Sequence, residues 1–341
     1  MKIQEAINHF INGESLSSEQ MQAVMREVMT GNASDAQIGG FLIALRMKGE
    51  TSAEILGAAQ VMRELATKVE VDSSALIDTV GTGGDSAGLF NVSTASAFIV
   101  AAAGGKVAKH GNRSVTSNSG SADLLEEAGV RLDLSAEEVA RCVNEVGVGF
   151  MFAVNHHSAM KHAIGPRKQL AARTIFNLLG PLTNPANALH QVIGVFEPQW
   201  LPVFAEVLQQ FGSKHVLCVS SADGLDEISI ADTSFVTELK NGDITSYEIT
   251  PTEFGLPTHT LDSLKVATPE ESLRLIKAAL SGEHSAAADM LAFNAGAAIY
   301  AGDLCSNLQQ GVDMAQDAIG SGLALQKLQE LADFTTLLKA N

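Results

Sequence analysis

Cysteine is scarce in this chain of 341 residues, and its three cysteines lie far apart, at Cys142, Cys218 and Cys305. An odd number of cysteines with no CxxC pair indicates neither a disulfide framework nor a zinc site. We therefore expect all three thiols to be buried and chemically inert.

Long apolar runs are also missing. No window approaches the roughly 18 uncharged apolar residues that a membrane-spanning helix needs, and the N-terminal stretch MKIQEAINHFINGE carries charges within its first helix instead of an apolar signal region. We therefore expect a soluble, cytoplasmic protein with no membrane partner.

Positive charge is in deficit, because 22 Lys and Arg stand against 39 Asp and Glu and leave a net charge of -17. Nucleic-acid binding requires a basic surface, so this balance argues against a nucleic-acid partner. Two stretches, 86–122 and 146–196, nevertheless contain no acidic residue. Their cations include Lys106, Lys109, Arg113, Lys161, Arg167, Lys168 and Arg173. The clustering predicts a local anion site, with chance clustering at a crossing between domains as the alternative.

The first seventy residues show helix signals only. Capping boxes at helix starts pair Ser17 with Gln20, Ser34 with Gln37, and Thr51 with Glu54. The pattern predicts a small helical domain over residues 1–70. The basic, helical segment 158–183 is expected to join it.

From residue 75 onward short apolar runs alternate with helical stretches, over a predicted second domain of residues 71–341. The expected strands are 76–80, 106–111, 148–153, 190–196 and 215–221, with helices such as 94–103 and 121–127 between them. This alternation is typical of an α/β fold with a mostly parallel sheet flanked by helices. Residues 235–250 predict an antiparallel hairpin with Asn241 and Gly242 at its turn, and residues 269–338 return to helices.

A glycine-rich stretch, GTGGDSAGLFNVST at 81–94, follows the first predicted strand. It matches neither GxGxxG nor the P-loop, so dinucleotide and Walker-type sites lack support. Glycines allow successive N–H groups to point at phosphate oxygens, and Asn91, Ser93 and Thr94 stand at the start of the next helix, where an anion is favoured. The alternatives are a tight turn and ordinary helix capping.

Two further motifs carry candidate chemistry. The loop from Gly111 to Ser121, after Lys109, is hydroxyl-rich and suits a diphosphate, although a surface loop has the same composition. Asp226 and Glu227 follow the strand at 215–221 and suit Mg²⁺ bound together with substrate phosphates, although adjacent surface carboxylates are often only solvated.

Six motifs in order, DTVGTGGD, NVSTA, KHGNR, SGSADLLE, RTIFNLLGPLTNPA and DGLDE, make the chain resemble the anthranilate phosphoribosyltransferase family of tryptophan biosynthesis. The resemblance runs over nearly the whole chain. It implies transfer of the phosphoribosyl group of 5-phosphoribosyl 1-diphosphate (PRPP) to the amino group of anthranilate, with release of diphosphate. It further implies Mg²⁺, a homodimer, and a small helical domain beside a larger α/β domain.

Residue by residue, the resemblance assigns three sets. PRPP would contact Gly81, Gly84, Asp85, Asn91, Val92, Ser93, Thr94, Lys109, His110, Gly111, Asn112, Arg113, Ser114, Val115, Thr116, Ser117 and Ser121. Anthranilate would meet Gly81, Asn112 and Arg167, and the metal would meet Ser93, Asp226 and Glu227. Position 89, often a hydroxyl residue in the family, is Leu89 here, so one expected phosphate contact is missing.

The charges of the reactants indicate the mechanism. An aryl amine is neutral at pH 7, so we expect positioning and stabilisation of the leaving diphosphate, with Lys109 as an electrostatic catalyst and no single nucleophile. His110, His156 and His157 are candidates for a proton relay, or buried structural residues. The alternatives to the transferase are a pyrimidine nucleoside phosphorylase and a non-catalytic DNA-binding relative of the same fold.

Overall fold

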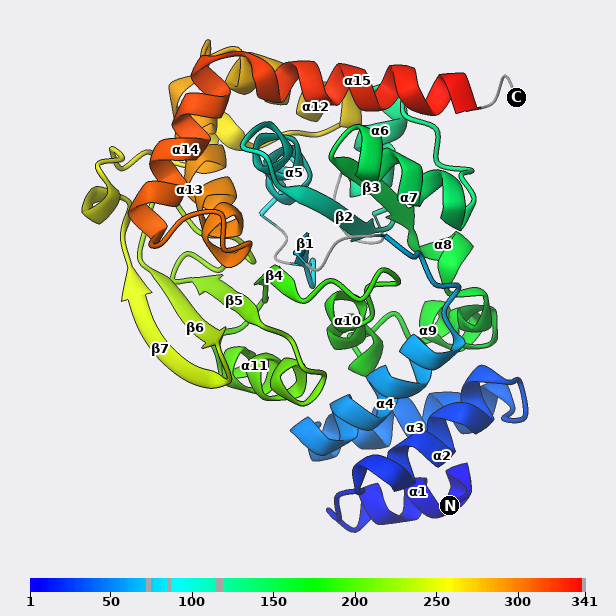
Figure 1. The fold of residues 1–341 in the computed structure, drawn as a ribbon. Coiled ribbons are helices and arrows are strands. Elements are labelled where there is room, and N and C mark those ends of the chain that lie inside the picture. Colours follow the sequence, from blue (N-terminus) through cyan, green and yellow to red (C-terminus); the bar gives the residue numbers. More distant parts are fainter. Residues whose placement is uncertain (72–74, 85–86, 115–118, 339–341) are drawn as a thin grey trace.

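The computed structural model describes residues 1–71, 75–84, 87–114 and 119–338. A small helical domain lies below a larger α/β domain (Figure 1). The N-terminal helices are α1 (Ile3–Ile11), α2 (Ser18–Met29), α3 (Asp35–Lys48) and α4 (Ser52–Leu65). All three predicted capping boxes are present, so the helix starts in this domain are confirmed. No helix in the described ranges is long and apolar enough to cross a membrane.

The larger domain is built on one seven-stranded sheet in the order β3-β2-β1-β4-β5-β6-β7. Its strands are β1 (Leu76–Gly81), β2 (Lys106–Gly111), β3 (Val148–Phe152), β4 (His190–Gly194), β5 (His215–Ser221), β6 (Ser234–Lys240) and β7 (Asp243–Ile249). The strands β3-β2-β1-β4-β5 are parallel, whereas β5-β6-β7 pair antiparallel. The predicted hairpin is confirmed, with Asn241 at φ 54° and Gly242 at φ 90° in its turn.

Strand order changes direction between β1 and β4, because the chain first builds outward through β2 and β3 and then returns to the other side of β1. The carboxyl ends of the two strands at such a switch point form the usual ligand crevice of an open α/β sheet. Gly81 ends β1 and stands opposite Gly194, which ends β4.

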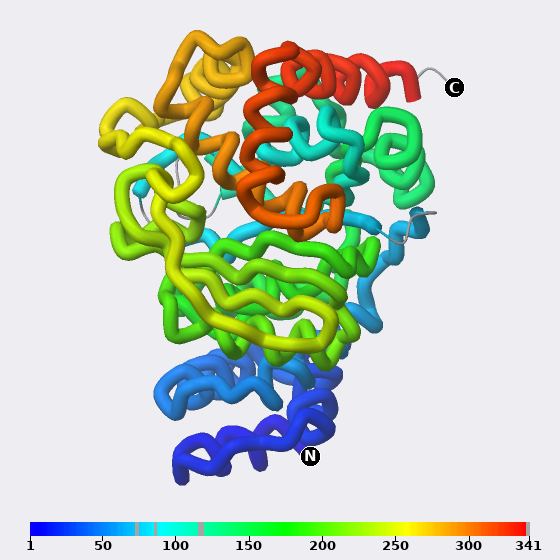
Figure 2. The backbone as a smooth tube through the Cα atoms, turned by 60° about the vertical axis from the view of Figure 1, so that its left-hand side comes forward, coloured from blue at the N-terminus to red at the C-terminus, as the bar shows by residue number. Residues whose placement is uncertain are grey.

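Helices cover both faces of the sheet. One face carries α5 (Val92–Ala102), α6 (Ser121–Glu127), α7 (Ala136–Glu145) and the C-terminal helices α12 (Pro269–Leu280), α13 (Ser285–Ala301), α14 (Leu308–Gly320) and α15 (Leu323–Leu338). The other face packs on α10 (Ile175–Leu179) and α11 (Leu201–Gln210), and its apolar core continues into the N-terminal helices. Figure 2 shows the N-terminal and C-terminal helices on opposite sides of the sheet.

Several predicted elements have different limits in the structure, and the strand expected at 190–196 ends at Gly194. The strand expected at 148–153 ends at Phe152, because Ala153 begins the short helix α8 (Ala153–His156). The segment 158–183 is interrupted: α9 (Lys161–Leu170) ends at Ala171 in the left-handed conformation, and an extended stretch precedes α10. Both α9 and α10 contact the N-terminal helices. The division of the chain at residue 70 stays a prediction.

The expectation of three buried thiols is wrong for one of them. Cys142 and Cys218 are fully buried, and burial raises the pKa of Cys142 to about 12 and also raises that of Cys218. Cys305 is only half-buried, because it lies in the connection between α13 and α14 at the edge of the core.

Candidate active site

The glycine loop, Gly81–Gly84, turns at the carboxyl end of β1. Gly83 and Gly84 have φ of 68° and 83°, the left-handed region that residues with a Cβ rarely adopt. Thr82 N–H donates to Gly194 O at 2.8 Å, which continues the pairing of β1 with β4. Gly83 N–H donates to Asp226 Oδ2 at 2.7 Å. The loop is therefore held from the neighbouring strand and from the DGLDE motif.

Asp226 lies directly over the ends of the two switch-point strands. A Cβ on Gly81 would stand 2.6 Å from Asp226 Oδ2, and a Cβ on Gly194 would stand 1.5 Å from Asp226 O. Only glycine leaves room for the Asp226 carboxylate at position 81 and for the Asp226 main chain at position 194, and Asp226 is 8% exposed. The structure thus brings Asp226 to the glycine loop, although 143 residues separate Asp226 from Gly83.

The loop that carries Asp226 and Glu227 is fixed by a third acid. Asp223 accepts a hydrogen bond from Ser221 Oγ at 2.5 Å with one carboxylate oxygen and from Ser229 Oγ at 2.6 Å with the other. These bonds connect the end of β5 to the residues beyond Glu227. Analysis of the motif alone missed Asp223, although it is the first acid of DGLDE.

Lys109 is buried, with 2% of its surface exposed. Its Nζ donates to Thr79 O and, at 3.4 Å, to Ser93 Oγ. Burial lowers the pKa of Lys109, while Asp78 and Glu227 favour its charged form. Lys109 is therefore connected to two of the three predicted metal residues, to Ser93 by a hydrogen bond and to Glu227 by the interaction of their charges.

Asp78 is the buried counterion in this network, and it was not among the predicted site residues. It is 0% exposed, and burial raises its pKa to about 6, against the opposing effects of Lys109 and of hydrogen bonds. Asn184 Nδ2 donates to Asp78 Oδ2 at 2.7 Å, and His110 N–H donates to Asp78 Oδ1 at 3.2 Å. A buried charge of this kind requires such partners.

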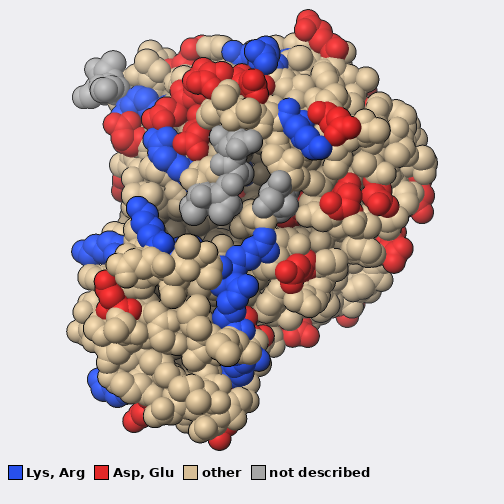
Figure 3. Space-filling view, turned by 180° about the vertical axis from the view of Figure 1, so that it is seen from behind, with Lys and Arg blue, Asp and Glu red and all other residues tan. Residues whose placement is uncertain are grey.

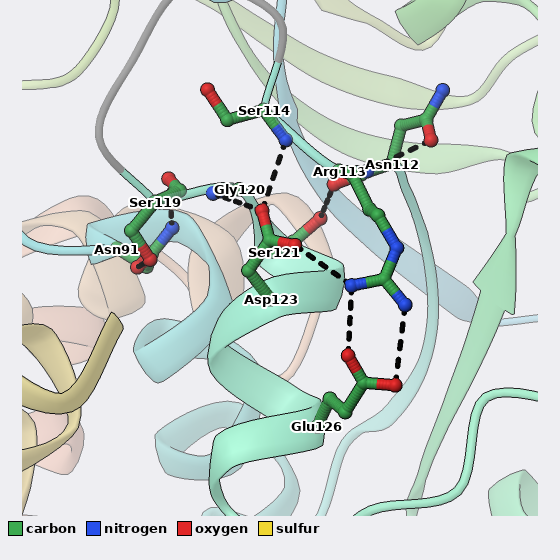
Figure 4. A network of polar contacts seen from close by, with 9 residues as sticks. All are labelled: Asn91, Asn112, Arg113, Ser114, Ser119, Gly120, Ser121, Asp123 and Glu126. Carbon is green, nitrogen blue, oxygen red and sulfur yellow. Dashed lines mark hydrogen bonds and ion pairs between the residues drawn. The ribbon is translucent and has the colours of Figure 1, made fainter. Parts of the chain in front are cut away.

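Asn91, at the start of α5, contacts two segments outside that helix. Asn91 does not cap the helix; its Nδ2 donates to Ser119 O at 3.0 Å, and its Oδ1 accepts from Ser119 Oγ and Ser272 Oγ, both at 2.8 Å (Figure 4). Val92 lies in the core and donates its N–H to Phe90 O. Thr94 Oγ1 is buried and has no hydrogen-bond partner within the described ranges. Asn91 therefore attaches the end of the hydroxyl-rich loop to α5 and α12.

The described ends of the hydroxyl-rich loop meet at Asp123 in α6 (Figure 4). The Asp123 carboxylate accepts the N–H groups of Ser114 at 3.1 Å and Gly120 at 3.0 Å. Arg113 is also turned to α6, where it pairs with Asp123 at 2.9 Å and Glu126 at 2.8 Å. In this conformation the Arg113 guanidinium is neutralised by α6 carboxylates.

Other predicted residues of this loop are also accounted for. Ser121 Oγ donates to Asn112 O at 3.2 Å, and a Cβ on Gly111 would lie 2.1 Å from Ser121 Oγ, so the strand end and the helix start are in close contact. Asp85, Val115, Thr116 and Ser117 lie outside the described residues.

Three neighbouring histidines lie buried where the chain passes between the domains. The rings of His110 and His157 are 5.1 Å apart, and His156 Nδ1 is 3.0 Å from Thr67 O. Burial, followed by the neighbouring histidines, lowers the pKa of His110 well below its usual value and that of His157 to about 4. Both are therefore neutral at pH 7, and their role as proton relays stays a prediction.

Arg167, predicted to meet anthranilate, extends from α9 as a half-buried cation. Its guanidinium lies 5.1 Å from the Phe176 ring centroid, and burial lowers its pKa. No hydrogen bond or ion pair occupies this guanidinium in the part of the chain that the structure describes. A planar cation next to an aromatic ring suits an aromatic carboxylate.

The surface between the domains is hollowed. Figure 3 shows Lys and Arg side chains on both sides of the hollow, whereas groups of Asp and Glu lie above it and along the right-hand side of this face. A cleft of about 260 Å³ between the domains is lined by residues of both, including Arg46, Glu50, Arg173, Phe196 and Trp200. The second acid-free basic stretch, 146–196, thus contributes Arg173 and Phe196 to the surface between the domains.

Comparison with known families identifies the class of protein. The model described as "Glycosyl transferase family, helical bundle domain" matches residues 4–66, and "Glycosyl transferase family, a/b domain" matches residues 73–325. The chain is therefore a glycosyltransferase of this two-domain type, as the fold and the switch-point site indicate.

Individual relatives identify the family within this class of glycosyltransferases. The chain is 60% identical to anthranilate phosphoribosyltransferase of Hahella chejuensis, over 99% of each chain, and 59% identical to that of Marinomonas sp., over 98% of this chain and 97% of the relative. The chain belongs to the anthranilate phosphoribosyltransferase family, which confirms the resemblance of its motifs.

Solved structures of anthranilate phosphoribosyltransferases have the same fold as this chain. The crystal structure of the Thermus thermophilus enzyme superposes with a TM-score of 0.91 at 42% identity, covering 97% of this chain and 99% of the other. The Saccharomyces cerevisiae enzyme in complex with PRPP and Mg gives a TM-score of 0.88 at 26% identity, covering 98% of each chain.

Proposed function

We propose that this protein transfers the 5-phosphoribosyl group of PRPP to the amino group of anthranilate, giving N-(5-phosphoribosyl)anthranilate and diphosphate, the second step from chorismate to tryptophan. The observation that carries the proposal is the meeting of Asp226 with the glycine loop at the switch point of the sheet. Full-length identity to relatives with this activity in their names supports it.

The residues at this site fit Mg²⁺. Asp226 and Glu227 offer carboxylates and Ser93 a hydroxyl, and Mg²⁺ is usually held by one or two carboxylates together with substrate phosphates. No cluster of three or more His, Cys, Asp or Glu side chains suited to a metal occurs among the described residues, as expected if phosphates complete the site. When bound, Mg²⁺ neutralises charge on the leaving diphosphate.

The protein's own groups would position the two substrates. The glycine loop and the start of α5 hold PRPP, the Lys109 charge stabilises the departing diphosphate through the network with Ser93 and Glu227, and Asn112 and Arg167 hold anthranilate. The anthranilate nitrogen attacks the ribose C1 as the bond to diphosphate breaks. The neutral amine needs no base before the attack; its nitrogen becomes cationic as the bond to C1 forms and then loses one proton to water or to the departing diphosphate, and no protein nucleophile takes part.

A homodimer and a cytoplasmic location complete the proposal. Exposed apolar side chains on the helical domain, Ile11 at 70% and Met47 at 83% exposure, support contact with a second copy there. Analytical ultracentrifugation of the wild type and of Met47→Glu tests it: we expect a dimer that weakens in the variant, and a monomeric wild type contradicts it.

The activity is tested by loss of anthranilate fluorescence on mixing protein, PRPP and MgCl₂. We expect loss that requires PRPP, stops with EDTA and falls at least 100-fold in Asp226→Ala/Glu227→Ala. Glu206→Ala, an exposed acid on α11, is the matched control and should be unchanged. Phosphorolysis of a pyrimidine nucleoside without transfer to anthranilate would instead support the phosphorylase alternative.

A further inference from the structure

Arg173 lies in the extended stretch between α9 and α10, and its backbone is bound to the N-terminal domain. Arg46 at the end of α3 donates from Nη1 to Arg173 O. The stretch is short, since Ala171 ends α9 in the left-handed conformation and α10 begins at Ile175. The main chain of Arg173 is therefore held by the helical domain.

The side chain of Arg173 crosses to the α/β domain. Its Nη2 donates to Gly84 O in the glycine loop, and a Cβ on Gly84 would lie only 3.2 Å from that nitrogen. The guanidinium also lies 4.3 Å from the centroid of the Phe196 ring. Phe196 N–H in turn donates to Thr82 Oγ1 at 3.1 Å. Both contacts of the side chain thus end on the glycine loop or on a residue bonded to it.

The chemistry of these contacts is specific to arginine. A planar guanidinium can lie against an aromatic ring with its face and donate a hydrogen bond with its edge at the same time, whereas an ammonium cannot. No carboxylate pairs with Arg173 among the residues described, so its contacts are with a carbonyl and a ring. A substitution here therefore removes the contacts of Arg173 with the glycine loop and Phe196 without leaving an unpaired acid.

We propose that Arg173 is a positioning residue that fastens the glycine loop to the helical domain and couples occupation of the loop to movement of that domain. The connection itself is a property of the free protein. Its link to PRPP rests on the proposed function.

The structure supplies a probe of this connection. Trp200 is the only tryptophan of the chain, and it lines the cleft between the domains together with Arg46 and Arg173. A change in the position of the helical domain relative to the sheet alters the surroundings of Trp200. Its fluorescence can therefore follow PRPP binding in MgCl₂, with anthranilate omitted so that only the protein emits.

The variants are Arg173→Ala and Arg173→Lys, with Lys168→Ala as the control because Lys168 is an exposed cation of the same basic stretch. In the free protein we expect amide hydrogen exchange of residues 80–84 to be at least fivefold faster in both Arg173 variants than in the control. Thermal unfolding serves to show that each variant is folded at the temperature used.

With PRPP and MgCl₂, we expect calorimetry to show about tenfold weaker binding in Arg173→Ala, as for loss of a charged hydrogen bond. We expect the Trp200 response at saturating PRPP to be lost in both variants, since Lys restores the charge but not the paired contacts. Unchanged exchange in residues 80–84, or a full Trp200 response in Arg173→Ala, overturns the proposal. If the wild type binds no PRPP, the proposed function fails, while the exchange experiment still decides whether Arg173 holds the loop.

Discussion

The Asp226 carboxylate is hydrogen-bonded to the glycine loop, and this predicts an unusual response to its removal. Its carboxylate accepts Gly83 N–H at 2.7 Å, so one N–H group able to bind a phosphate is already bound to an anion. In Asp226→Ala this N–H is free and the repulsion of a nearby carboxylate is gone. We expect diphosphate to bind more tightly to Asp226→Ala than to the wild type when no metal is present.

The magnitude follows from the bond that diphosphate must displace. A hydrogen bond to a charged group contributes about 1.5–3 kcal/mol, which corresponds to roughly 10- to 150-fold in affinity. Diphosphate must lose part of its hydration to reach the loop beside Asp226, which is 8% exposed, so part of this gain is lost. We expect a gain of about fivefold to twentyfold for Asp226→Ala and a smaller gain for Asp226→Asn, whose amide oxygen can still accept from Gly83.

The assay is calorimetric titration with inorganic diphosphate, once in EDTA and once in MgCl₂. We expect the order of affinities to reverse: Asp226→Ala binds more tightly than the wild type in EDTA and more weakly in MgCl₂, where the carboxylate is needed. Equal or weaker binding by Asp226→Ala in EDTA would refute the reasoning, because the carboxylate would then not compete with the anion.

Four further outcomes are expected. Folding raises the pKa of Asp78 to about 6, so between about pH 4 and 6 the folded protein holds a proton on Asp78 that the unfolded protein has lost. As the pH rises through this interval, the free energy of unfolding should therefore fall by roughly 3 kcal/mol relative to that of Asp78→Asn, as measured by urea titrations. Arg167→Ala should raise the KM for anthranilate more than tenfold and leave PRPP affinity within twofold, and a larger effect on PRPP would place Arg167 elsewhere. Lys109→Met should lower kcat about 100-fold or more, and turnover within a few fold of wild type would contradict the electrostatic role. Leu89→Ser should lower the KM for PRPP about threefold by restoring a hydroxyl, and an unchanged KM would show that this position does not meet phosphate.

Much of the fold is predictable because its signals are local. A capping box satisfies N–H groups within four residues, and the Asn241–Gly242 turn requires only two residues with positive φ, so both are readable without knowledge of the partner segments. Alternation of apolar strands with helices likewise implies a parallel sheet. The order and spacing of the motifs identified the family.

The site depended on contacts between distant segments. Sequence alone placed both Lys109 and Arg113 among the residues that meet PRPP, yet burial beside Asp78 couples Lys109 to Ser93 and Glu227, while Arg113 lies at the surface and pairs with α6. Asp223 and Arg173 both stand in motifs of the sequence, but the hydrogen bonds by which they hold loops that carry other site residues are visible only in the structure.

The sequence by itself determined the local backbone: the helix starts, the glycines that permit a sharp turn after β1, and the chemical types of the groups that meet there. Tertiary structure decided which of these groups are buried, paired or free, because burial and pairing arise only when segments over a hundred residues apart come together, as Asp226 and Gly83 do. The pKa values of Asp78 and Lys109, and the connection of the glycine loop to the helical domain through Arg173, follow from that assembly.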